Sequence, residues 1–98
     1  MVANRNEVQE CVVQCLVEMS PLDNTPPVDE ETNPMLHLCL DSHDGVNLAC
    51  KLTERFSYEI PEDLNPLVDD ERKRPRRVGE IVDLVCKLIG ARKVENNG

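Results

Sequence analysis

Residues 41–61 read DSHDGVNLACKLTERFSYEIP, and this stretch decides the fold. Asp41 and Ser42 are residue types that favour the N-cap of a helix, and an acidic residue in the first turn suits the positive end of the helix dipole. The apolar residues that follow recur at helical spacing, which predicts an amphipathic helix over about 42–56 and then an extended turn closed by Pro61. The expected buried stripe is Val46, Ala49, Leu52 and Phe56, with Leu48 beside it.

The N-terminal stretch shows the same period. It predicts a helix over about 4–19, capped by Asn4 or Asn6 and stopped by Pro21. Glutamates in its early turns suit the helix dipole. Its apolar residues form one continuous stripe: Val8, Cys11, Val12, Cys15, Leu16 and Met19.

The C-terminal stretch predicts the last helix, over about 78–90. Gly90 suits the position just after a helix, and residues 94–98 are expected to fray. A long apolar stripe again recurs at helical spacing, which indicates a face turned to the core. The stripe is Val78, Ile81, Val82, Val85, Leu88 and Ile89.

Two less regular segments connect these helices. Residues 20–40 contain four prolines and predict a long loop, which must be anchored to the core because long loops are uncommon in small domains. Residues 61–77 are polar and variable, with a short helix expected over 62–67 or 67–73. The sum is an all-α chain of three main helices plus a short one, in a single domain over 1–98. The expected loop anchors are Leu22, Val28, Met35, Leu36, Leu38 and Leu40.

Composition narrows the class of function. A chain of 98 residues suits one small domain and leaves little room for a deep enzyme cleft. The net charge is −8, and five of the eleven basic residues lie in 72–77, so the remainder carries −13. Such a surface repels phosphate backbones, which argues against nucleic-acid binding and favours partners with basic patches.

The cysteines and the lengths of the apolar runs bear on the cellular compartment in which the protein is found. Five cysteines form no CxxC pair, and an odd count does not suggest a disulfide framework. The N-terminus has no signal-type apolar region, and no run approaches the length of a membrane span. We therefore expect a reduced, cytoplasmic protein whose cysteines act as small apolar residues.

Two segments of the chain resemble the acyl carrier protein family, the phosphopantetheine-binding carrier domains. Residues 41–61 are similar, without a gap, to the family signature D-S-L-x-x-V-x-L-x-x-x-L-E-x-x-F-x-I-x-I-P. Residues 77–83, RVGEIVD, are similar to the T-V-G-D-x-V-D start of the family's last helix. The matching residues of the first segment are Asp41, Ser42, Val46, Leu48, Leu52, Phe56, Ile60 and Pro61.

This resemblance implies a small antiparallel helical bundle that is not an enzyme. Ser42 would accept 4′-phosphopantetheine covalently from coenzyme A, and Asp41 would belong to the motif that the phosphopantetheinyl transferase recognises. First-turn N–H groups would help to accommodate the phosphate. The arm's thiol would carry acyl groups as thioesters in fatty-acid, lipid or polyketide-type biosynthesis, and apolar space between the helices would shelter the acyl chain.

The resemblance also implies how partners bind. Acyl-loading and acyl-processing enzymes would dock on the helix over 42–56 of a monomeric carrier, steered by its acidic surface. Several residues there depart from the family pattern, which favours a specialised carrier over one for the housekeeping fatty-acid synthase: His43 replaces leucine, Asn47 and Thr53 replace acidic residues, and Lys51 and Arg55 add positive charge. The expected partner surface is His43, Val46, Asn47, Cys50 and Glu54.

Other interpretations of the serine were weighed. Ser42 can be an ordinary N-cap, and it can also be both cap and modification site. A hydrolase is disfavoured because adjacent residues of a helix point about 100° apart, so His43 is poorly placed to deprotonate Ser42, and no G-x-S-x-G elbow is present.

Three further alternatives concern other residues or the chain as a whole. The spacing H-x-C-x-D-x-H over 37–43 fits no standard zinc pattern, so we expect no metal site. The basic residues of 72–77 lack interleaved aromatics and follow three acidic residues, which favours a solvated loop or a docking site for an acidic partner. The rivals to an acyl carrier are a helical interaction module without cofactor and a carrier of aminoacyl or peptidyl intermediates.

Overall fold

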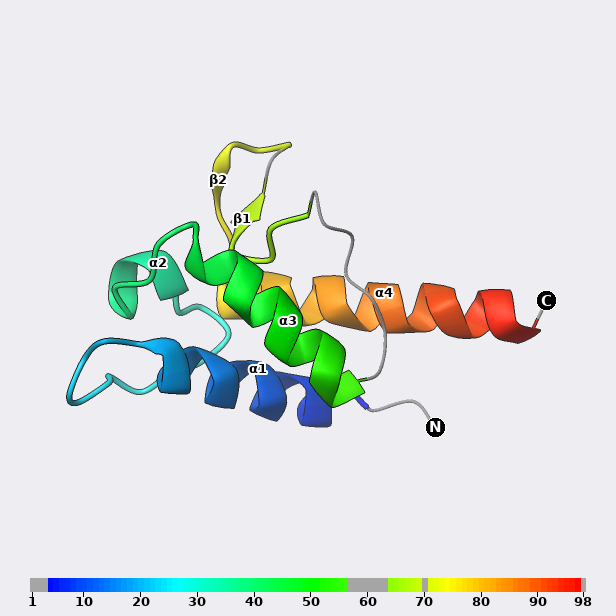
Figure 1. The fold of residues 1–98 in the computed structure, drawn as a ribbon, viewed down its shortest axis with the longest axis horizontal. Helices are drawn as coiled ribbons and strands as arrows, with labels where there is room; N and C mark the ends of the chain where they lie inside the picture. Colours follow the sequence, from blue (N-terminus) through cyan, green and yellow to red (C-terminus); the bar gives the residue numbers. More distant parts are fainter. Residues whose placement is uncertain (1–3, 57–63, 70, 98) are drawn as a thin grey trace.

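The computed structural model describes residues 4–56, 64–69 and 71–97. The chain is mostly helical, with a small hairpin, and Figure 1 shows its arrangement. The turn predicted over 57–61 lies outside the described residues. The elements, in chain order, are α1 (Arg5–Met19), α2 (Pro34–His37), α3 (Asp44–Phe56), β1 (Val68–Asp69), β2 (Arg74–Pro75) and α4 (Val78–Asn97).

Helix α1 is the central packing element, since it contacts both α4 and α3. In Figure 1, α1 and α4 run in opposite directions along the long axis, and α3 crosses obliquely. The hairpin and α2 lie toward the end where α3 begins. One apolar core joins the elements, and its fully or almost fully buried members are Val8, Val12, Cys15, Leu16, Leu38, Leu40, Leu48, Leu52, Leu67, Val78, Ile81, Val82 and Val85.

The caps explain where α1 begins and ends. The Asn4 side chain accepts a hydrogen bond from the Glu7 backbone N–H at 2.9 Å, so Asn4 rather than Asn6 is the N-cap. At the other end, the Ser20 N–H donates to the Leu16 carbonyl at 3.0 Å, and Pro21 follows. The Ser20 hydroxyl then donates to the Leu38 carbonyl at 2.9 Å, which ties the end of α1 to the distal part of the loop.

The buried face of α3 differs from the predicted one. Gly45, Leu48 and Leu52 are its buried residues, whereas Val46 is 63% exposed. Val46 therefore does not lie on the buried side that the apolar stripe predicted, and it has the exposure that its place in the expected partner surface requires. Successive residues of a helix point about 100° apart, so burying position 45 turns position 46 toward solvent. Ala49 and Phe56 pack against the core from its margin.

The long loop over 20–40 contains a short helix, α2, that the sequence pattern does not predict. The Asn33 side chain caps α2 by accepting from the N–H groups of Met35 and Leu36, and Pro34 occupies the first helical position. Of the six predicted anchors, Leu38 and Leu40 are buried, and Val28 and Met35 are partly buried. The other two, Leu22 and Leu36, are exposed, because they point away from the faces that α2 and the loop turn to the core.

A hairpin stands where a helix over 67–73 was expected. Val68 pairs with Pro75 and Asp69 with Arg74. The Asp69 carboxylate accepts from the N–H groups of Glu71 and Arg72, which turns the chain. These side-chain contacts give the backbone an alternative to helix, so the predicted helix over 67–73 is wrong. For the helix over 62–67, residues 62 and 63 lie outside the described part, and residues 64–67 are not helical.

The last helix is longer than predicted. Helix α4 continues through Gly90 to Asn97, so Gly90 does not end it and residues 94–97 belong to the helix. Glycine within a helix costs about 1 kcal/mol relative to alanine but does not terminate it. The residues after Gly90 include Ala91, Arg92 and Lys93, which are good helix formers.

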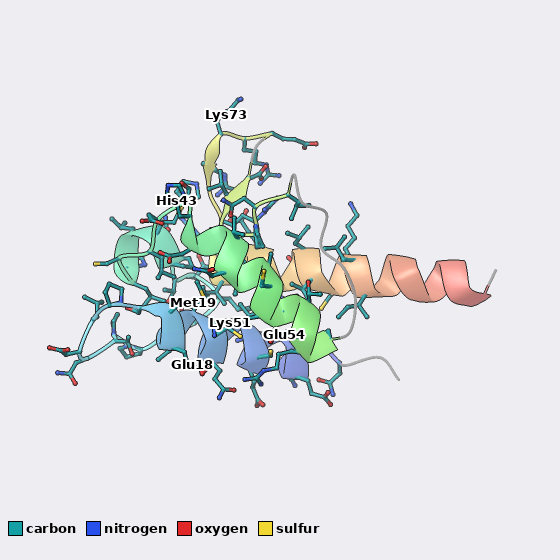
Figure 2. All side chains as sticks on the ribbon, viewed as in Figure 1. Glu18, Met19, His43, Lys51, Glu54 and Lys73 are labelled. Carbon is teal, nitrogen blue, oxygen red and sulfur yellow. The ribbon has the colours of Figure 1, made fainter. Side chains whose placement is uncertain are left out.

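The hairpin turn supplies a test of the fold. Lys73, at the tip of the hairpin in Figure 2, has a φ of 57°, a left-handed conformation that costs free energy for residues with a Cβ. We expect Lys73→Gly to raise the free energy of unfolding by about 0.5–1 kcal/mol, measured by urea denaturation. Lys73→Ala is the matched control, because it removes the charge and keeps the Cβ. Equal stability of the two variants would contradict the turn.

Candidate functional site

The turn around Ser42 is built by two carboxylates that bond to each other's backbone. Asp41 Oδ1 accepts from the N–H groups of His43 at 2.9 Å and Asp44 at 3.2 Å. In return, Asp44 Oδ2 accepts from the Asp41 N–H at 2.9 Å. This reciprocal arrangement is a capping box. It makes Asp41 the capping residue, and α3 begins at Asp44, two residues later than the predicted start at Ser42.

Ser42 is therefore a residue of the turn and not the cap itself. Its side chain is exposed. Among the hydrogen bonds of the described residues, none occupies its hydroxyl, because Asp41 already serves the N–H groups that a capping serine would serve. The hydroxyl is therefore available to a reagent from solvent.

The carbonyl of Ser42 is held from the other side of the turn. Asn65 Nδ2 donates to it at 2.8 Å, across 23 residues of sequence. The Gly45 N–H also donates to it, at 3.2 Å, in the first turn of the helix. Ser42 thus has a restrained backbone and an unrestrained hydroxyl.

Gly45 makes room for Asn65. A Cβ built on Gly45 would lie 1.8 Å from Asn65 Oδ1 and 2.4 Å from its Cγ, so the amide occupies the space of the missing side chain. Any larger residue at position 45 must displace Asn65 or shift α3. Sequence patterns did not reveal either residue, because their contact joins segments far apart in the chain.

The carboxylates at this turn change one expectation about an attached phosphate. The N–H groups of His43 and Asp44 already have Asp41 as their acceptor, so the predicted use of these groups to hold a phosphate is not available in this conformation. Two carboxylates beside Ser42 also repel an anion. A phosphate on the Ser42 oxygen fits when it points outward into solvent, and no residue of this turn cradles it.

The five residues of the predicted partner surface lie on one side of α3. All five are exposed, at positions 43, 46, 47, 50 and 54, which is the spacing of a continuous helical stripe. In Figure 2, His43 lies beside the start of the helix and Glu54 near its other end. We name this side the α3 surface: His43, Val46, Asn47, Cys50 and Glu54.

Beneath α3, buried side chains of the described residues pack together. Leu48 and Leu52 meet Leu38 and Leu67 in the core, and all four are completely buried. Two surface hollows lie elsewhere: one of about 520 Å³ lined by charged residues near the starts of α1 and α4, and one on α1 around Val13. Neither of these two hollows is an apolar space between the helices of the kind expected for an acyl chain.

Three of the residues considered as metal ligands have other contacts. His37 Nδ1 accepts from the Asn33 N–H at 2.8 Å, and Asp41 and Asp44 form the capping box. Within residues 4–56, 64–69 and 71–97, no three His, Cys, Asp or Glu side chains are arranged to hold a metal ion.

The cysteines divide into two groups. All five are free thiols. Cys11 and Cys15 face the core, and the pKa of Cys11 is raised to about 11, first by burial and then by the neighbouring Cys15. Such a thiol is uncharged at neutral pH and a poor nucleophile. Cys86 is half-buried against the core. Cys39 and Cys50 are exposed. Cys39 therefore does not act as a core residue, whereas Cys50 has the exposure that its place in the expected partner surface requires.

The basic segment over 72–77 is largely engaged within the molecule. Arg74 bonds both carboxylate oxygens of Glu80, at 3.2 and 2.6 Å, and Arg77 pairs with Glu31 at 2.6 Å. Arg76 donates to backbone carbonyls of Asn65 and Val68. These contacts join the hairpin to α4 and to the acidic part of the loop, so most of the segment serves the fold.

Glu80 also completes the start of α4. Its Oε1 accepts from the Arg77 N–H at 2.9 Å, and the carbonyls of Thr32 and Glu30 accept from the next two N–H groups of the helix. The Arg77 N–H, followed by Arg74, lowers the pKa of Glu80 below its ordinary value. Glu80 therefore links the hairpin to the start of α4, while the N–H groups of Val78 and Gly79 link the helix to the loop.

A lowered pKa for Glu80 has a defined consequence for stability. The ionised form is favoured by folding, so its contribution is present above the ordinary pKa of 4.5 and is lost as the pH falls through the lowered value. We expect Glu80→Gln to cost about 1–2 kcal/mol of unfolding free energy near neutral pH and less near pH 3. Urea denaturation at both pH values measures the difference. A cost that is independent of pH would contradict this role.

The contact of Gly45 with Asn65 predicts a coupling between two substitutions. Alanine for glycine within a helix normally stabilises by about 1 kcal/mol. Because of the clash with Asn65, we expect Gly45→Ala to destabilise by about 1–3 kcal/mol instead. In an Asn65→Ala background the same change should be neutral or stabilising. A double-mutant cycle by chemical denaturation tests this, and additive effects would contradict the contact.

The remaining observations concern membrane-spanning helices and similarity to known proteins. In the described part of the chain, no helix combines the length and apolar character that crossing a bilayer requires. No family model, no curated protein and no solved structure matches the sequence or the fold. The function must therefore be inferred from the residues themselves.

Proposed function

We propose that this protein is a carrier that receives 4′-phosphopantetheine on Ser42 and holds acyl intermediates as thioesters on the arm's thiol. The observation that carries the proposal is the state of Ser42: an exposed serine, directly after Asp41, with a restrained backbone and an unoccupied hydroxyl among the described contacts. The resemblance of residues 41–61 and 77–83 to carrier domains supports the same assignment.

The arrangement of the helices supports a carrier-type bundle. We propose that α1, α3 and α4 form a small antiparallel bundle, with α2 as its short helix and the long loop after α1. The opposite directions of α1 and α4 and the shared core agree with this description. The hairpin is then an addition to the bundle, in the segment where this chain is longer and more basic than the family pattern.

The chain contributes the nucleophile and not the catalyst. When Ser42 is modified, its oxygen bonds to the phosphorus of coenzyme A that carries the pantetheine group. The phosphoanhydride bond to that phosphorus breaks and adenosine 3′,5′-bisphosphate leaves, while the serine proton passes to a base. In the described residues, no imidazole or carboxylate accepts a hydrogen bond from the Ser42 hydroxyl. The base must therefore come from the transferase, which suits a protein that is not itself an enzyme.

The α3 surface suits the docking of partner enzymes. It begins beside the turn that holds Ser42 and combines an apolar residue, Val46, with polar ones, which is the composition of a transient interface. Its only carboxylate is Glu54, so it is less acidic than the chain as a whole, with its net charge of −8. We propose partners that are steered by the acidic protein but dock on a nearly neutral helix face, which favours a specialised pathway.

The proposal includes a reducing, cytoplasmic setting and a monomeric carrier. Five unpaired thiols, two of them exposed, suit a compartment in which disulfides do not persist. The main rival is an interaction module without a cofactor, for which the exposed Val46 on α3 would be the binding contact. The two functions differ in what happens to Ser42.

Intact mass distinguishes them. The protein is incubated with coenzyme A and a broad-specificity phosphopantetheinyl transferase, alongside Ser42→Ala and the control Thr53→Ala, which removes a hydroxyl from α3. We expect the native protein and Thr53→Ala to gain the mass of one phosphopantetheine, and Ser42→Ala to gain none.

The carrier function is contradicted if the native protein gains no mass, or if Ser42→Ala gains as much as the native protein. In the first case the interaction module is the better assignment. In the second, the modified residue is not Ser42. Aminoacyl and acyl carriers are separated afterwards by the acids that loading enzymes transfer to the arm.

A further inference from the structure

The side chain of Asn65 makes a set of contacts that determines its orientation. Its Oδ1 accepts from the Leu67 N–H at 2.9 Å, and its Nδ2 donates to the Ser42 carbonyl at 2.8 Å. Only one assignment of the amide satisfies both, because an N–H needs the oxygen and a carbonyl needs the NH₂ group. The NH₂ group of Asn65 is therefore the donor to the Ser42 carbonyl.

Asn65 is itself held in place by the hairpin. Its carbonyl accepts from Arg76 Nη1 at 2.8 Å, and the same nitrogen donates to the Val68 carbonyl at 2.9 Å. The Arg76 N–H donates to the Leu67 carbonyl at 2.8 Å. Leu67 is completely buried, which anchors the segment in the core. Asn65 is thus fixed by charged, backbone and apolar contacts at once.

The close packing against α3 adds a steric restraint. The Asn65 amide sits in the space that a Cβ of Gly45 would occupy. Ser42 is then restrained on both sides: Asp41 accepts from the N–H groups that follow it, and Asn65 donates to its carbonyl. The peptide after Ser42 cannot rotate without breaking one of these bonds.

We infer that Asn65 is a positioning residue for Ser42: it holds the serine backbone so that the hydroxyl faces solvent in one orientation, ready for the transferase. This inference rests on the proposed carrier function. A restrained nucleophile reduces the entropy that the enzyme must remove on binding, which raises the rate of transfer. Asn65 and the residues that hold it then affect the rate at which Ser42 is modified, although none of them contacts the Ser42 hydroxyl.

The experiment that tests this role removes the donor NH₂ group of Asn65 and keeps its acceptor oxygen. Asn65→Asp keeps the shape and the Oδ1 acceptor for Leu67, but near neutral pH it presents no donor to Ser42. We expect the kcat/KM for phosphopantetheine transfer to fall about tenfold, the effect of losing one hydrogen bond, with the KM for coenzyme A unchanged. The carbonyl ¹³C resonance of Ser42 should shift in the same variant.

Val82→Ala is the matched control for stability. Val82 is completely buried on α4, so this change destabilises the fold without altering any contact of Ser42. We expect it to leave kcat/KM within about twofold of native under conditions where the protein stays folded. Equal rates for native protein and Asn65→Asp, or an equal loss in Val82→Ala, would overturn the positioning role. Failure of the native protein to accept the arm would instead overturn the carrier function itself.

Discussion

The N–H groups at the start of α3 need acceptors, and the Asp41 carboxylate supplies them. The rest of the site depends on this interaction. Because Asp41 is the cap, the serine that follows it is not consumed in capping, and its hydroxyl remains exposed. Because Asp44 bonds back to Asp41, the turn is closed at both ends. Ser42 thus lies in a rigid turn in which its carbonyl has partners and its hydroxyl is open to solvent.

A second set of contacts explains why the basic segment belongs to an acidic protein. Arg74, Arg76 and Arg77 bind carboxylates or carbonyls of the same chain, Glu80 joins the hairpin to the start of α4, and Arg77 pairs with Glu31 of the loop. Exposed ion pairs contribute little individually, but those around Glu80 share partners and have several hydrogen bonds. Arg74 and Arg77 are therefore neutralised locally by carboxylates of the same chain, within a protein whose net charge is −8.

Regular periodicity made part of this structure predictable. The apolar stripes of the first and last helices place Val8, Val12, Val82 and Val85 in the core, because a long 3.6-residue period has one possible buried side. In α3 the spacing of the apolar residues correctly predicted a helix, but it did not predict which side of the helix is buried. Asn65 packs on Gly45 and turns position 45 inward, so Val46 is exposed. The hairpin was missed because its turn depends on Asp69 and its base on Arg76, and neither contact has a periodic signal. Ser42 was found from its sequence neighbours, whereas Asn65, 23 residues away, was visible only in three dimensions.

The exposed serine and the α3 surface together describe a small protein that presents one hydroxyl beside an exposed helix face. The most direct test of the central claim is the mass of the protein isolated from the cells that make it, with fragmentation to locate any added group. The carrier function predicts one phosphopantetheine on Ser42 in a substantial fraction of the molecules. A population that is entirely unmodified at Ser42 would contradict it.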